Sequence, residues 1–212
     1  MPIKTDLTTF AMEAVTDFLT VGAIAPSSRH LIHAMLRPLP VAKARVVVEV
    51  GAGTGAMTRA LLDLLPADGT LLAFEINTRF ARYLESNVLD RRLQVINASA
   101  ETLQHEVHRR GFDHVDAVLS SLALGFMPDK VRRAFLGELG GVLGESGVFT
   151  QYQYLHRLQL KNGHVRKFHL VHLLRRYFSS VQQKMIWRNL PPAFVFACQR
   201  PLPLEAVGSL QS

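Results

Sequence analysis

The order of apolar and polar positions along the chain predicts strands and helices that alternate. Val46–Val50 is dominated by β-branched residues, which is typical of a strand that a parallel sheet buries on both faces. Over residues 56–65 apolar positions instead recur every three or four residues, which predicts a helix. Further strands are expected at 71–76, 93–96, 116–119 and 147–154, and further helices at 80–85, 101–110, 131–143 and 168–177.

The two ends of the chain depart from this alternation. Apolar residues recur at helical spacing over 10–19, and a second helix is expected between the capping pair Ser27–Ser28 and Arg37–Pro38. Strand patterns at 181–187 and 193–198 are joined by only a few residues, so these two strands should run antiparallel. We therefore expect a doubly wound α/β sheet that is mostly parallel. The expected parts are an N-terminal helical extension (1–40), the main domain (41–200) and a flexible tail (201–212).

Composition is that of one globular domain and argues against several kinds of site. Of 212 residues, 48% are hydrophobic and 19% are charged, which is enough to bury a sizeable core. The single cysteine, Cys198, excludes an intramolecular disulfide, favours a reducing compartment and argues against structural zinc. The histidines lack metal-ligand spacing, so we expect no metal. No apolar run reaches the roughly 18 residues of a membrane-spanning helix, which favours a cytoplasmic protein, free or attached to a membrane surface.

The positive charge is concentrated in the C-terminal third. The chain has 24 Lys and Arg against 17 Asp and Glu, a formal net charge of +7. Nine of the basic residues, and no acidic one, lie between Ser146 and Leu204, so the rest of the chain has 15 basic and 17 acidic residues. A segment of this kind favours a polyanion or a phosphate-bearing partner.

A glycine-rich turn after the first strand is the most specific local signal. Gly51, Gly53 and Gly55 form a GxGxG pattern, in which a strand can turn sharply into a helix while its backbone approaches a ligand closely. Glu75 ends the next strand, where a carboxylate can accept hydrogen bonds from both ribose hydroxyls of a nucleotide. Glu49 would repel a pyrophosphate and suits a ligand with positive charge. S-adenosylmethionine, with its ammonium and sulfonium groups, fits this combination.

These features resemble those of class I S-adenosylmethionine-dependent methyltransferases. The resemblance covers roughly residues 20 to 200 and implies a Rossmann-like sheet of seven strands, the last antiparallel, with S-adenosylhomocysteine as product. Where the family has an acidic residue for the adenine amino group, this chain has Ser99, whose hydroxyl accepts a weaker hydrogen bond. The implied cofactor contacts are Glu49, Gly51, Gly53, Gly55, Glu75, Ala98, Ser99, Ala100 and Ser120.

Three segments, 20–29, 120–128 and 187–193, resemble bacterial phospholipid N-methyltransferases in particular. This resemblance implies N-methylation of phosphatidylethanolamine toward phosphatidylcholine at the inner face of the membrane. The reaction is an in-line displacement by a neutral amine, in which positioning supplies much of the acceleration. Tyr152 and Tyr154, at the end of the fifth strand, are candidates to orient that amine.

The lipid phosphate needs hydrogen-bond donors. Arg188, in the turn of the terminal hairpin, is the first candidate because a guanidinium binds phosphate with two parallel hydrogen bonds. Ser27, Ser28 and Arg29 are the second, because a helix start with two hydroxyls and a guanidinium makes an anion site. For contact with an anionic membrane surface, the basic stretch 155–176 is a better candidate than the N-terminal helix, whose polar face is acidic.

Other functions stay open on the sequence. A nucleic-acid methyltransferase, such as an rRNA adenine dimethylase, would use the basic third to follow phosphates. It is less favoured, because residues 120–123 replace the NxP[YF]-type motif and offer no aromatic side chain to stack on a flipped adenine. A methyltransferase with a small soluble substrate and a non-catalytic cofactor-binding protein are further alternatives. The oligomeric state is not set by the sequence, although a monomer is favoured.

Overall fold

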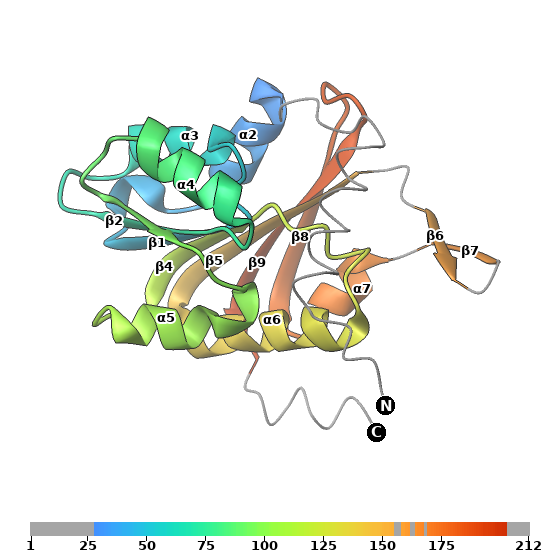
Figure 1. The fold of residues 1–212 in the computed structure, drawn as a ribbon. Coiled ribbons are helices and arrows are strands. Elements are labelled where there is room, and N and C mark those ends of the chain that lie inside the picture. Colours follow the sequence, from blue (N-terminus) through green and yellow to red (C-terminus); the bar gives the residue numbers. More distant parts are fainter. Residues whose placement is uncertain (1–27, 155–157, 162–163, 168, 203–212) are drawn as a thin grey trace, which may run out of the picture.

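A sheet of seven strands forms the centre of the molecule. The computed structural model describes residues 28–154, 158–161, 164–167 and 169–202 (Figure 1). The order of the strands in the sheet is β3-β2-β1-β4-β5-β9-β8. Their bounds are β1 (Val46–Val50), β2 (Thr70–Phe74), β3 (Leu93–Ile96), β4 (Val115–Ser120), β5 (Leu143–Tyr154), β8 (Phe178–Ile186) and β9 (Ala193–Pro201).

The direction of the strands confirms the predicted sheet. Strands β1 to β5 pair in parallel, whereas β9 is antiparallel to both of its neighbours, β5 and β8. Strand β8 therefore runs in the same direction as β5, and the carboxyl ends of six strands meet at one edge. In open sheets of this type, ligands bind at that edge, where the strand order reverses between β1 and β4.

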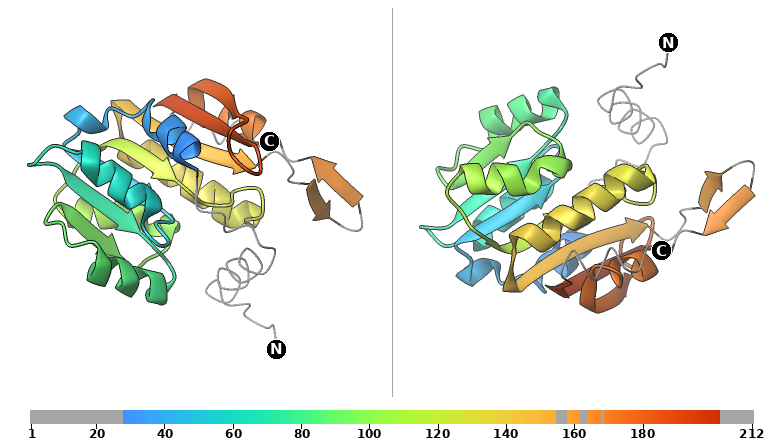
Figure 2. Two further views of the ribbon diagram at one scale, coloured as in Figure 1. Left: turned by 90° about the horizontal axis from the view of Figure 1, so that it is seen from above. Right: turned by 90° about the horizontal axis from the view of Figure 1, so that it is seen from below.

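Helices cover both faces of the sheet, as a doubly wound fold requires (Figures 1 and 2). One face carries α2 (Arg29–Leu36), α3 (Ala56–Leu64) and α4 (Thr78–Asn87), and the other carries α5 (Leu103–Arg109), α6 (Asp129–Val142) and α7 (Leu170–Leu174). Two short 3-10 helices, η1 (Val41–Lys43) and η2 (Ala100–Thr102), precede β1 and α5.

Strand β1 shows why this sequence needs two covering layers. Its five residues are all buried. Val46, Val48 and Val50 face the cluster that includes Phe135 of α6, whereas Val47 faces the cluster of α2 and α3. Alternate side chains of a strand point to opposite faces, so an almost continuously apolar strand is stable only between two layers of helices.

Two parts of the observed structure differ from the elements expected from the sequence. The helix expected at 168–177 is only α7, because the chain turns at Arg175 before β8 begins. Between β5 and α7 the structure adds a separate two-stranded sheet, β6 (Leu158–Lys161) paired antiparallel with β7 (His164–Lys167), which stands apart from the seven-stranded sheet in Figure 2. The Asn162–Gly163 dipeptide between them is a strong hairpin signal that could have predicted it.

The ends of the described chain join the fold through specific contacts. Ser28 caps α2 by accepting a hydrogen bond from the Leu31 N–H at 3.2 Å, as the sequence predicted for this pair of serines. Strand β9 extends to Pro201, and the Leu202 N–H donates to the Tyr177 carbonyl at 2.8 Å. The helical pattern at 10–19, Ser27 and the tail from residue 203 lie outside the described residues. Within the described part of the chain, no helix is long and apolar enough to cross a membrane.

Candidate active site

The glycine turn after β1 has the conformation that its sequence predicts. Gly51, Gly53 and Gly55 have φ angles of 80°, 55° and 85°, a region that residues with a Cβ rarely adopt. A Cβ at Gly55 would lie 2.7 Å from Leu84 Cδ2 and 2.9 Å from a terminal nitrogen of Arg59, so these side chains would have to shift to make room for it. A Cβ at Gly53 would meet nothing within 4 Å, which leaves open space beside the turn for a ligand.

Glu75 holds the glycine turn from the end of β2. Its Oε2 accepts a hydrogen bond from the Gly53 N–H and its Oε1 accepts one from the Asn77 N–H, both at 2.8 Å. Burial raises the pKa of this carboxyl above its usual value, while the hydrogen bonds from Asn77 and Gly53 act in the opposite direction. A carboxylate oxygen can accept more than one hydrogen bond, so Glu75 keeps acceptor positions for ribose hydroxyls.

Glu49 lies inside the protein directly under the turn. Its side chain is fully buried, and its Oε2 accepts a hydrogen bond from the Thr58 hydroxyl of α3 at 2.6 Å. Burial raises the pKa of Glu49 to about 8; the Thr58 hydrogen bond lowers it, and the nearby charge of Glu75 raises it further. Among the residues that the structure describes, its Oε1 has no hydrogen-bond partner. A buried carboxyl oxygen without a partner is the feature expected where a cationic ligand group binds, and thus fits the ammonium group of S-adenosylmethionine.

The segment after β3 contains a carboxylate that the sequence analysis missed. Ala98, Ser99 and Ala100 are half-buried, and Ser99 caps η2 as expected of a serine. The Ser99 hydroxyl also donates to Glu101 Oε2 at 3.3 Å. Glu101 therefore brings a negative charge next to Ser99, the position where the family has an acidic residue. In the sequence, the signal for this carboxylate was an acidic residue two positions after Ser99.

We expect the substitution Glu101→Gln to weaken cofactor binding by about fivefold, because a hydrogen bond to a charged acceptor is stronger than one to a neutral amide by about 1 kcal/mol. Glu85→Gln, on the exposed surface of α4, is the matched control. Titration calorimetry with S-adenosylhomocysteine measures both. Equal affinities for the two variants would remove Glu101 from the binding site.

Residues at and after the carboxyl ends of β4 and β5 connect the glycine turn with a second part of the site. Ser120 is buried opposite Val50 of β1, and its hydroxyl accepts a hydrogen bond from the Leu122 N–H at 3.2 Å. The Leu122 side chain reaches to within 3.1 Å of the place where a Cβ on Gly51 would lie. Gln151, which the sequence analysis did not select, is fully buried and donates from Nε2 to the Leu122 carbonyl at 2.9 Å. Its Oε1 has no hydrogen-bond partner within the described part of the chain.

Tyr152 and Tyr154 lie together on the far side of that loop. Their rings meet edge to face, with centroids 5.3 Å apart. Both line a small pocket together with residues 121–125 and Leu170. Since Leu122 contacts the glycine turn and also lines this pocket, the structure brings the predicted amine-orienting pair next to the predicted cofactor site.

The turn between β8 and β9 brings three of the predicted phosphate donors together. Asn189 is buried in this turn, where its Oδ1 accepts from the Ser28 N–H at 3.2 Å and its Nδ2 donates to the Pro191 carbonyl at 2.7 Å. Arg188 and Arg29 therefore lie at one end of a groove between α2 and β8, and both line it. Ser27 lies outside the described residues. Asn189, which makes this connection, was not predicted.

A parallel sheet continued by an antiparallel hairpin, with a GxGxG turn and two buried carboxylates at its carboxyl edge, defines an S-adenosylmethionine-dependent methyltransferase. The described residues contain no group of three or more His, Cys, Asp or Glu that could hold a metal ion. The comparisons with known proteins show that the chain belongs to this family, whose cofactor is S-adenosylmethionine. A family profile described as a methyltransferase domain matches residues 47–147.

Individual relatives agree with this family. An ornithine lipid N-methyltransferase of Singulisphaera acidiphila is 31% identical over 180 residues, which cover 84% of this chain and 88% of that protein. A ribosomal RNA small subunit methyltransferase H of Aromatoleum aromaticum is 32% identical over 94 residues, but these cover only 44% of this chain and 30% of that protein. A Burkholderia thailandensis 1,6-didemethyltoxoflavin-N1-methyltransferase has the same fold, with a TM-score of 0.64 and 19% identity over 92% of this chain and 87% of its own.

Proposed function

We propose that this protein transfers methyl groups to the amine of a membrane lipid, with phosphatidylethanolamine as the preferred acceptor. The observation that carries the proposal is the cluster of donors at the β8–β9 turn, where Arg188, Arg29 and the start of α2 lie together beside the site. The ornithine lipid N-methyltransferase relative supports a lipid acceptor, because it aligns with most of the chain.

In the cofactor half of the site, the carboxylates would hold the ligand. Glu75 would accept the ribose hydroxyls, and Glu49 Oε1 would accept from the ammonium group. Ser99 and Glu101 would face the adenine amino group. When bound there, S-adenosylmethionine supplies a methyl group on a positively charged sulfur. The open space at Gly53 lets the ligand approach the backbone of the turn without meeting a side chain.

The acceptor amine must reach the site without its extra proton. A free alkylammonium has a pKa of about 10, and burial in an apolar pocket favours the neutral amine. The pocket beside Tyr152 and Tyr154 is lined largely by apolar side chains and backbone. In this proposal the hydroxyls of Tyr152 and Tyr154, which line that pocket, orient the amine nitrogen. Positioning of this kind is the main contribution that the chain makes to the rate.

The anionic group of the lipid would be bound across the mouth of the site. Tyr154 pairs with Ala193, and Ala193 pairs with Ile186 on the next strand, so the turn that begins after Ile186 lies two strands from Tyr154. Two strand spacings are about 10 Å, a span that the long side chain of Arg188 helps to close. The first backbone N–H groups of α2, at Arg29 and His30, have no intrahelical acceptor and add to the positive potential.

An ornithine lipid is the second candidate acceptor. The specific observation in its favour is the 31% identity to the ornithine lipid N-methyltransferase. An amino-acid headgroup offers a carboxylate instead of a phosphate, and arginine binds both anions with two parallel hydrogen bonds. The arginines at this turn thus suit both lipids, and only the relative rates of methyl transfer distinguish the two acceptors.

A transfer assay tests the proposal directly. Purified protein and radiolabelled S-adenosylmethionine are offered vesicles with phosphatidylethanolamine, vesicles with ornithine lipid, ribosomal RNA, and small soluble amines. Label in phosphatidylethanolamine, exceeding label in ornithine lipid, supports the proposal. Faster transfer to ornithine lipid would show that the acceptor is a lipid other than phosphatidylethanolamine. Label only in RNA or only in soluble amines would show that the acceptor is not a lipid.

For the phosphate site, we expect Arg188→Ala to raise the KM for the lipid about tenfold, because a charge-assisted hydrogen-bond pair is lost, and to leave cofactor affinity unchanged. Arg188→Lys keeps the charge but not the paired donors, so an intermediate KM is expected. Arg82→Ala, on the exposed side of α4, is the control. Steady-state kinetics on vesicles give the values. If Arg188→Ala and the control show the same KM, Arg188 does not bind the headgroup.

A further inference from the structure

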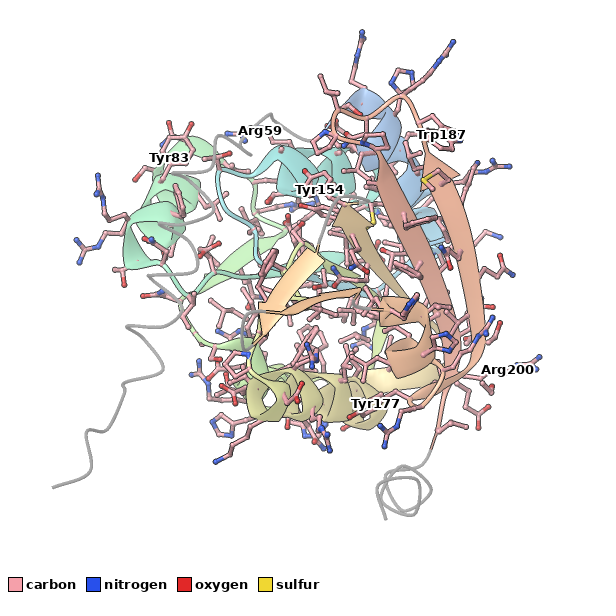
Figure 3. The ribbon with its side chains drawn as sticks, turned by 90° about the vertical axis from the view of Figure 1, so that its right-hand side faces the viewer. Arg59, Tyr83, Tyr154, Tyr177, Trp187 and Arg200 are labelled. Carbon is pink, nitrogen blue, oxygen red and sulfur yellow. The ribbon has the colours of Figure 1, made fainter. Side chains whose placement is uncertain are left out.

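The turn between β8 and β9 carries two large apolar side chains that contact little of the protein. Trp187 is 70% exposed and Leu190 is 84% exposed, although they lie only three residues apart. Single exposed apolar residues are normal on a protein surface, but a pair of this size at one protruding turn marks a contact surface. Trp187 lies at the same end of the molecule as Tyr154, and Tyr177 and Arg200 lie at the opposite end (Figure 3).

The backbone of this turn is held in place while its apolar side chains face outward. Asn189, between the two exposed residues, is 4% exposed and bonds both to the Ser28 N–H and to the Pro191 carbonyl. The turn is thus anchored to α2 through a residue that points inward. Because the turn is already held in place, binding a partner through Trp187 and Leu190 does not require the turn to become ordered first.

The charged side chains in the groove beside the turn are all basic. The groove beside it, between α2 and β8, is lined by Arg29, His30, His33, Arg37, Lys184 and Arg188, and none of the described lining residues is acidic. Lys and Arg near an anionic bilayer each favour binding to it. An indole and an aliphatic side chain surrounded by arginines match the chemistry of the membrane interface, where Trp is enriched and Lys and Arg meet the headgroups.

The composition of the turn also limits the free-energy cost of moving its backbone from water into the membrane interface. Backbone N–H groups are costly to remove from water unless they are hydrogen-bonded. Pro191 and Pro192 have no N–H, and the Pro191 carbonyl already accepts from Asn189. A nucleic acid would contact the arginines equally well, but its phosphate backbone offers no apolar partner for Leu190.

We propose that residues 187–192, the docking turn, insert Trp187 and Leu190 into the headgroup region of an anionic bilayer. This inference rests on the proposed function, since it places the mouth of the site against the membrane that contains the lipid acceptor. The basic groove beside the turn then faces the charged headgroups, and Arg188 lies at the boundary between docking and substrate binding.

The chain provides its own reporter for this contact, because Trp187 is its single tryptophan. We expect tryptophan emission to shift to shorter wavelength when vesicles of phosphatidylglycerol and phosphatidylcholine are added to the full-length protein. Acyl chains brominated near the headgroup should quench the emission more than chains brominated near the terminal methyl. Unchanged emission with the anionic vesicles, or an equal shift with ribosomal RNA, would overturn the proposal.

A matched pair of variants separates docking from general surface hydrophobicity. Leu190→Ser should weaken vesicle binding about tenfold, as expected when an apolar side chain of this size no longer leaves water. Leu89→Ser is the control, because Leu89 is 89% exposed but lies between α4 and β3, next to Asp90. Equal vesicle affinities for the two variants, measured by sedimentation, would overturn the role of the turn.

Methyl transfer then distinguishes failure of docking from failure of the proposed function. The rate is measured on vesicles and on a short-chain phosphatidylethanolamine below its micelle concentration. In Leu190→Ser, the ratio of the first rate to the second should fall about tenfold, whereas Leu89→Ser should keep the wild-type ratio. An unchanged ratio counts against the docking turn. Absence of transfer to either lipid, with the emission shift intact, counts against the acceptor assignment and not against docking.

Discussion

Replacing Glu75 by alanine is expected to weaken binding of S-adenosylhomocysteine by about 100-fold. The carboxylate would accept both ribose hydroxyls, and hydrogen bonds to a charged group contribute about 1.5 kcal/mol or more each, so losing two costs about 3 kcal/mol. The same change removes the acceptors of the Gly53 and Asn77 N–H groups, which fix the glycine turn in its binding conformation. Glu75→Gln should bind with intermediate affinity, because its amide retains one acceptor oxygen.

Titration calorimetry on the purified variants measures this effect. Glu85→Ala is the control, since Glu85 is an exposed acidic residue of the neighbouring helix α4. Thermal unfolding of the ligand-free variants checks that the fold survives, because Glu75 is not part of the apolar clusters that form the core. A Glu75→Ala variant that folds and binds with wild-type affinity would show that the ribose is held elsewhere.

Cofactor affinity is expected to rise about tenfold between pH 6 and pH 7 and to level off near pH 8. In the ligand-free protein the Glu49 carboxyl, with a pKa of about 8, carries a proton below that pH. Pairing with an ammonium group requires the carboxylate, so binding at lower pH must first release this proton, and one released proton gives one tenfold step per pH unit. Near pH 8 the amino group of the ligand begins to lose its own charge, which ends the rise.

Calorimetry in two buffers of different ionisation enthalpy counts the released proton. We expect nearly one proton per bound S-adenosylhomocysteine at pH 6.5, and a flat pH profile for Glu49→Gln. The raised pKa has a second effect on the ligand-free protein: because the unfolded chain loses this proton near pH 4.5, stability falls as the pH rises from about 4.5 to about 8. No proton release at pH 6.5 would show that Glu49 does not pair with the ligand cation.

Local sequence patterns predicted the part of the site that depends on one strand and the turn after it. The glycines and Glu49 belong to a single strand–turn–helix unit, and Glu75 follows the adjacent strand. Because the carboxyl ends of parallel strands meet at one edge, the alternation of elements was enough to place these residues together. The hairpin of β8 and β9 was predictable for a similar reason, since only a few residues separate its strands.

The residues that sequence reasoning missed act through contacts between distant segments. Asn189 binds Ser28, which lies 161 positions away, and Gln151 binds the Leu122 carbonyl across 29 positions. Both are buried amides whose roles depend on the tertiary structure, and a single Asn or Gln in a sequence carries no periodic signal. Glu101 is different, because its value to the site appears only when the Ser99 hydroxyl is seen to donate to it.

The position of β9 has a consequence for the order in which the chain can fold. This strand is the last one along the described part of the chain, yet it lies between β5 and β8. Until residues 193–201 have been synthesised, β8 has no strand to pair with, and the edge of β5 is open. During synthesis β1 to β4 leave the ribosome first and can assemble early, but half of the mouth of the site forms only after residues 193–201 have been synthesised. The donors at Arg188 and the pocket at Tyr154 are therefore joined only once β9 has paired with both β5 and β8.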